Sequence, residues 1–157
     1  MNKVLPKTLS RYLAVQAAYN LIISSDKNEI IDNFNSKSTS IFIDFDKKIK
    51  KRNIDKGFFL KIFNNFCDKK INIDELISKN LNGKWKLARL PLVISAILSV
   101  AISELILFPK TSIKIIVSEY LEIAESFHNV DEIKFINAIL DKIYKEIHDE
   151  QQRITNN

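Results

Sequence analysis

Hydrophobic side chains recur every three or four residues along most of this chain, which is the period of a helix with one buried face. Seven segments show the pattern, at residues 7–24, 26–34, 54–69, 72–81, 91–108, 112–127 and from 131 to about 149. Asp26 and Asn72 each precede a glutamate by three positions, as the first residue of a capping box does. The pattern therefore predicts an all-α fold of six or seven helices joined by short links.

The segment at 91–108 is apolar on nearly all sides, so it is expected to form the central helix against which the others pack. The least certain part is 36–53, where "IFIDF" is compatible with a loop, a helical piece or a short strand. We expect a single domain over residues 1–150, followed by a frayed tail at 151–157. The longest apolar run, at 90–103, has 14 residues and is too short for a membrane span, so a cytoplasmic protein is expected.

The first predicted helix has two unlike faces. One is an ordinary core stripe, made of Ala14, Val15, Ala18, Leu21 and Ile22. The other gathers two tyrosines and two amides, namely Tyr12, Tyr19, Gln16 and Asn20, together with Ile23. This second face either packs on a neighbouring helix or serves as a binding surface.

Composition argues against the common enzyme classes. Two glycines and one cysteine leave no phosphate-binding glycine loop and no paired-cysteine metal site. Glu104 and Glu119 could form a carboxylate pair, but a buried glutamate bonded to a lysine or a helix end is the more frequent arrangement. His128 and His148 lack metal-ligand spacing. No catalytic residue, metal or cofactor is therefore expected.

Charge is divided unevenly along the chain. Residues 1–110 hold 19 lysines and arginines against 10 acidic residues, whereas residues 111–150 hold 4 against 9. Lys3, Lys7 and Arg11 are the charged residues of the N-terminal segment, and a second basic run occupies 47–56. Cations for phosphates, rings for stacking and amides for base edges are what a single-stranded RNA site needs. The N-terminal segment supplies all three.

Four segments resemble the NusB family, and they follow one another in the order of that family. "RYLAVQAAY" at 11–19 is similar to its A-V-Q-A-L-Y helix, and "AILSVAISELI" at 96–106 to its I-L-R-x-A-x-Y-E-L helix. "KIIVSEYLEIAESF" at 114–127 and "DEIKFINAILDKI" at 131–143 resemble its last two motifs. The resemblance implies two small helical bundles and a transcription antitermination factor without catalytic activity.

The resemblance also implies partners and contact residues. NusB proteins bind boxA RNA, chiefly of ribosomal RNA operons, together with the small-subunit ribosomal protein NusE. The pair acts on elongating RNA polymerase with other Nus factors. The expected RNA contacts are Lys3, Lys7, Arg11, Gln16, Tyr19, Lys134 and Phe135. Asp131 and Ile94 are the positions expected to face the ribosomal protein.

This chain departs from the family pattern in ways that leave alternatives open. The family's dense arginine cluster is thinned to "PKTLSR", and Ser99, Ser103 and Ala138 replace the usual Arg, Tyr and Gly. One alternative is the NusB-like domain that precedes ribosomal-RNA cytosine methyltransferases. Another is a helical protein–protein adaptor with no RNA role. A homodimer that covers the RNA face also stays open.

Overall fold

The computed structural model describes residues 6–24, 28, 54–81, 86–126 and 130–156. Within these residues every regular element is helical, and no strand occurs. The elements are α1 (Pro6–Ser24), α4 (Lys56–Asp68), α5 (Lys70–Asn80), the 3-10 turn η2 (Leu87–Arg89), α6 (Leu92–Leu107), α7 (Ile113–Glu125) and α8 (Val130–Thr155). The all-α prediction is confirmed. The segment at 36–53 and nearly all of the helix predicted at 26–34 lie outside the described residues.

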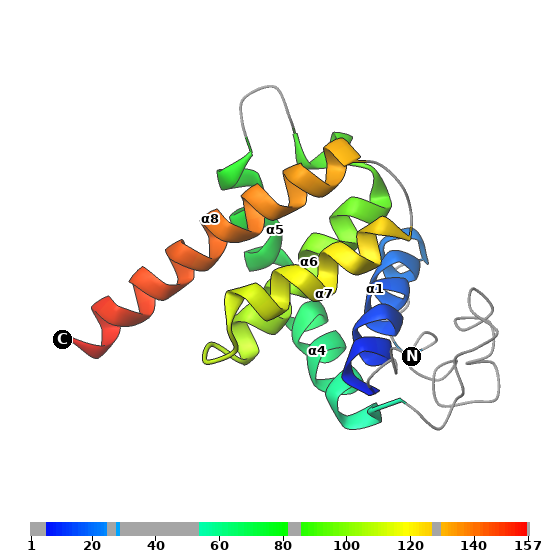
Figure 1. Ribbon diagram of the computed structural model, residues 1–157, viewed down its shortest axis with the longest axis horizontal. Coiled ribbons are helices and arrows are strands. Elements are labelled where there is room, and N and C mark those ends of the chain that lie inside the picture. The colour runs from blue at the N-terminus through cyan, green and yellow to red at the C-terminus, as the bar shows by residue number, and fades with distance from the viewer. Residues whose placement is uncertain (1–5, 25–27, 29–53, 82–85, 127–129, 157) are drawn as a thin grey trace.

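Helix α6 lies at the centre of the molecule, as its apolar sequence predicts. It packs against α1 and α4 on one side and against α5, α7 and α8 on the other (Figure 1). All but one of the residues from Ile94 to Leu105 are buried, including Leu98 at 0% exposure. Helix α6 is therefore shared by two small helical groups, one with α1 and α4 and the other with α5, α7 and α8.

The start of α5 differs from the prediction. The helix begins at Lys70, and Asn72 is an exposed residue within its first turn rather than its cap. Lys69 alone separates α5 from α4: its N–H donates to the Asn65 carbonyl (2.9 Å), and its own carbonyl accepts from Ile73 (2.8 Å). The helix therefore begins directly after α4, and no side-chain cap bonds to its first turn.

The buried face of α7 is also rotated from the predicted one. The prediction placed Ile113, Val117, Leu121 and Ala124 on the core stripe. The fully buried residues are instead Ile116, Tyr120, Ile123 and Ala124, while the three others are half-buried. Apolar residues cover more than one side of this helix, so periodicity alone does not select the face. The hydrogen bond of the Tyr120 hydroxyl to Glu104 on α6 accompanies the observed rotation.

Helix α8 continues to Thr155 and so includes most of the tail that was expected to be frayed. Figure 1 shows its C-terminal turns projecting beyond the other helices. Asn156 N–H donates to the Gln152 carbonyl (3.1 Å), and Arg153 lies in the last turn, where a cation favours the helix dipole. Among the described helices, none is both long and apolar enough to cross a membrane.

Candidate nucleic-acid interface

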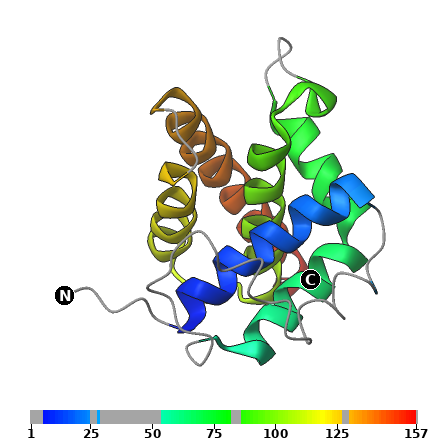
Figure 2. The ribbon, with the colours of Figure 1, turned by 90° about the vertical axis from the view of Figure 1, so that its right-hand side faces the viewer.

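Helix α1 is buried on most of its circumference and open along one side. It packs against α4 and α6, and more lightly against α7 (Figure 2). The half-buried residues on its open side are Tyr12, Gln16, Tyr19 and Asn20, with Leu21 and Ile22 beside them. Both tyrosine rings rest partly on the hydrophobic core. The face of tyrosines and amides is therefore anchored by apolar packing and still accessible to solvent.

Arg11 does not belong to this open face, contrary to expectation. Arg11 as a whole is only 6% exposed, and its guanidinium points into the protein. Nε and Nη2 donate to the two carboxylate oxygens of Glu104 at 2.8 and 2.7 Å, and Nη1 lies 3.1 Å from Glu119 Oε1. Glu104 is 1% exposed, and a buried carboxylate is stable only with a cation and hydrogen bonds. Arg11 is thus committed to the core rather than to a phosphate.

The Arg11 pair belongs to a polar cluster that joins three helices. The Tyr120 hydroxyl of α7 donates to Glu104 Oε1 (2.7 Å), and the Thr8 hydroxyl of α1 donates to Glu119 Oε1 (3.0 Å). The sequence indicated that the two glutamates could pair or that each could bind a lysine or a helix end. In the structure both bind one arginine, and neither Thr8 nor Tyr120 carried a sequence signal for this role.

Burial and charge determine the protonation of this cluster. Burial by itself would lower the pKa of Arg11, but the hydrogen bond and negative charge of Glu104 outweigh it, so the pKa is raised. Burial raises the pKa of Tyr120 well above its usual value, and the negative charge of Glu104 and the hydrogen bond to it add to the effect. Arg11 is therefore charged and Tyr120 is a neutral donor across the physiological pH range.

A second set of contacts positions the start of α4 beside α1. The Ser10 hydroxyl, fully buried, lies 2.8 Å from the Asp55 carbonyl and 3.0 Å from the Asp55 N–H. Asp55 in turn caps α4 by accepting from the Phe58 N–H (3.0 Å). The Lys7 ammonium lies over the Phe58 ring, 5.3 Å from the ring centroid, and the Arg11 guanidinium lies 5.1 Å from the same centroid. Lys7 and Arg11 therefore meet at Phe58, but only Lys7 is exposed.

The remaining predicted residues lie apart from α1. Asp131 and Lys134 are exposed in the first turns of α8, where Phe135 is half-buried against the core. Ile94 is 2% exposed in the first turn of α6, so its expected place at a partner surface is wrong. A side chain buried to this extent has no surface to offer to a partner. Lys3 lies outside the described residues.

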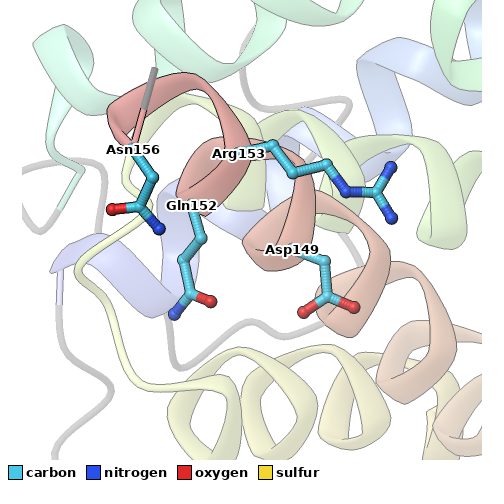
Figure 3. A pocket seen from close by; sticks show the side chains of 4 residues that line it. All are labelled: Asp149, Gln152, Arg153 and Asn156. Carbon is cyan, nitrogen blue, oxygen red and sulfur yellow. The ribbon is translucent and has the colours of Figure 1, made fainter.

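Two hollows on the described surface lie along the C-terminal half of α8. One, of about 610 Å³, lies between the end of α5 and α8, where Lys79 and Asn80 bind Glu146. A second, of about 390 Å³, is formed by Asp149, Gln152, Arg153 and Asn156 (Figure 3). Figure 3 shows Arg153 extending away from Asn156, so these side chains do not converge on a common point. Within the described residues, no three His, Cys, Asp or Glu side chains could hold a metal ion.

Comparison with known proteins identifies the class of fold and then the family. The fold is that of NusB proteins: the crystal structure of T. maritima NusB matches with a TM-score of 0.70 and 27% identity, over 93% of this chain and 94% of that one. The chain belongs to the NusB family, whose sequence profile matches residues 8–145. The transcription antitermination protein NusB of Rickettsia conorii is 32% identical over 149 residues, covering 92% of this chain and 95% of that protein. The resemblance found in the sequence is confirmed, and the family is not one of enzymes.

More distant structures share the fold. One is a crystal structure of the antitermination factors NusB and NusE in complex with dsRNA, with a TM-score of 0.66 and 19% identity. It matches over 89% of this chain and 96% of that one.

A further relative by sequence is the transcription antitermination protein NusB of Rhizobium etli. It is 32% identical over 145 residues, covering 92% of this chain and 89% of that protein.

Proposed function

We propose that this protein binds the boxA element of nascent RNA, including transcripts of ribosomal RNA operons, and acts in the bacterial cytoplasm as an antitermination factor. The observation that carries the proposal is the open side of α1 in a chain of the NusB family. Its two tyrosines and two amides remain partly accessible on a helix that is otherwise buried. Planar rings and amides are the groups that stack on unpaired bases and bond to their edges.

Each side chain of the proposed site has a distinct role. Tyr19 stacks on a base, and Gln16, one turn earlier on the same face, bonds to a base edge. Lys7, together with Lys3 in the preceding segment, neutralises phosphates. Lys134 and Phe135 extend the site onto α8. Arg11 has a positioning role, because its ion pairs with Glu104 and Glu119 hold α1 against α6 and α7.

The proposed protein partner is the ribosomal protein NusE. A structural neighbour was crystallised with NusE and dsRNA. The excess of acidic residues over 111–150 suits a basic ribosomal protein, and Asp131 is exposed in the first turn of α8 to meet it. The RNA-bound pair would then act on elongating RNA polymerase with other Nus factors. A homodimer that covers the open side of α1 would compete with RNA.

Fluorescence anisotropy of a labelled boxA RNA tests the proposal. The protein is titrated with and without NusE, beside a scrambled RNA of equal length, at two salt concentrations. Binding that prefers boxA and tightens with NusE supports the proposal. Equal binding of both RNAs leaves only a basic surface, and no binding in either condition favours a protein–protein adaptor.

A further inference from the structure

Three exposed lysines from distant parts of the sequence lie on segments that meet at one pair of stacked phenylalanines. The rings of Phe58, in the first turn of α4, and Phe108, which caps the end of α6, lie with centroids 5.7 Å apart. The Lys7 ammonium lies 5.3 Å from the Phe58 centroid. Lys56 is two residues before Phe58, and Lys110 is two residues after Phe108. We call Lys7, Lys56 and Lys110 the lysine rim.

The backbone around the lysine rim is well determined by hydrogen bonds. Lys56 is the first residue of α4, whose start is joined to α1 through Ser10 and Asp55. Lys110 lies within a tight turn closed by the Thr111 N–H, which donates to the Phe108 carbonyl (3.0 Å). Two residues span at most about 7 Å, so each of these lysines starts close to the aromatic pair. Their side chains are exposed, as is that of Lys7.

The acidic groups placed near the rim already have partners. Asp55 accepts from the Phe58 N–H, and Glu119 is bound by Arg11 and Thr8. Among the described residues, no ion pair involves Lys7, Lys56 or Lys110. The first turns of α1 and α4 contain no acidic residue, although acids are favoured there by the helix dipole. Within the described part of the chain, no acidic side chain forms an ion pair with the rim, so its three lysines are accessible to an anionic ligand.

We infer that the lysine rim binds the phosphate backbone of RNA that leaves the open side of α1, which extends the RNA surface from α1 onto α4 and the α6–α7 turn. This inference rests on the proposed function. The lysine rim supplies cations for phosphate binding, which the thinned arginine segment and the buried Arg11 do not provide. Phosphate contacts position a nucleic acid without reading its sequence. The rim therefore contributes affinity, while Gln16 and Tyr19 contribute base preference.

The test compares the double variant Lys56→Ala/Lys110→Ala with the unchanged protein, using the boxA RNA and the scrambled RNA. For single strands, the salt dependence of log K changes by about 0.7 per phosphate contact, so losing two contacts lowers the slope by about 1.4. At about 0.1 M salt this corresponds to roughly 25-fold weaker binding. The loss is expected to be equal for both RNAs. The variant Lys56→Arg/Lys110→Arg is expected to bind like the unchanged protein.

Lys142→Ala is the matched control, because Lys142 is an exposed lysine on α8 beside α5. It is expected to leave affinity and salt slope unchanged, and all variants should keep the melting temperature. If the unchanged protein binds boxA and the double alanine variant binds with the same affinity and slope, the inference is overturned and the proposed function stands. A loss confined to boxA, or no rescue by arginine, also overturns it. If the unchanged protein binds no RNA, both proposals fail together.

Discussion

Arg11 of α1 and Glu104 of α6 form a buried ion pair with two hydrogen bonds, at 2.8 and 2.7 Å. The residues are 93 positions apart in sequence, and their side chains are 7% and 1% exposed. Because Glu119 and Tyr120 of α7 also bind this pair, it links the two helical groups of the fold. Arg11, which the sequence analysis assigned to RNA, instead orients the helix that carries the face of tyrosines and amides.

Replacing Arg11 with alanine is expected to destabilise the protein by about 3–5 kcal/mol, because Glu104 would be left buried without its cation. The double variant Arg11→Met/Glu104→Leu should regain part of this loss, since apolar residues of similar size can replace a buried pair. Urea unfolding of both variants measures the free energies. Unchanged stability of Arg11→Ala together with lost RNA binding would instead assign the side chain to the RNA.

Tyr120→Phe is expected to cost about 1.5–3 kcal/mol at neutral pH, the usual value of a hydrogen bond to a charged group. The native pKa of Tyr120 is raised, so above pH of about 10 the unfolded state loses a proton that the native state keeps. Rising pH then favours unfolding, and the stability contributed by Tyr120 is complete below about pH 10 and lost above it. The stability difference between the two proteins should therefore shrink from pH 10 to 11 in urea titrations. A constant difference would contradict this assignment.

Tyr19→Ala is expected to weaken boxA binding by about 1–3 kcal/mol through lost stacking. Preference over the scrambled RNA should fall as well, which distinguishes this residue from the lysine rim. Tyr144→Ala on α8 is the matched control, because Tyr144 is also half-buried and stacks on His148 with centroids 5.0 Å apart. Anisotropy titrations and thermal melts are measured on both. A fall in melting temperature without a change in affinity would show that the Tyr19 ring is mainly part of the core.

Leu98→Ala is expected to cost about 2–5 kcal/mol, because its side chain is fully buried in the central helix and its removal leaves a cavity. Ile115, which is 50% exposed on α7, offers a control: Ile115→Ala should change stability far less. Chemical denaturation of the two variants makes the comparison. Equal effects would mean that α6 is not the centre of the packing.

The helices and the family could be recognised from the sequence because both depend on local patterns. Apolar periodicity and the two prolines at 91 and 109 determined the central helix closely, and the quoted motifs determined the family. The start of α5 and the buried face of α7 could not be obtained in this way. Helix α5 follows α4 after the single residue Lys69 and begins without a side-chain cap, and the buried face of α7 is the one from which Tyr120 reaches Glu104. Neither arrangement shows in the local sequence pattern.

The same division applies to the candidate site. The sequence by itself determined that α1 carries a face of tyrosines and amides opposite its core stripe, because positions on one helix are related by a fixed rotation. Only the tertiary structure decided that Arg11 is buried and that the segments carrying Lys7, Lys56 and Lys110 meet at one aromatic pair. Those relationships join residues tens of positions apart, and whether a charge lies in water or in the core depends on the helices packed around it.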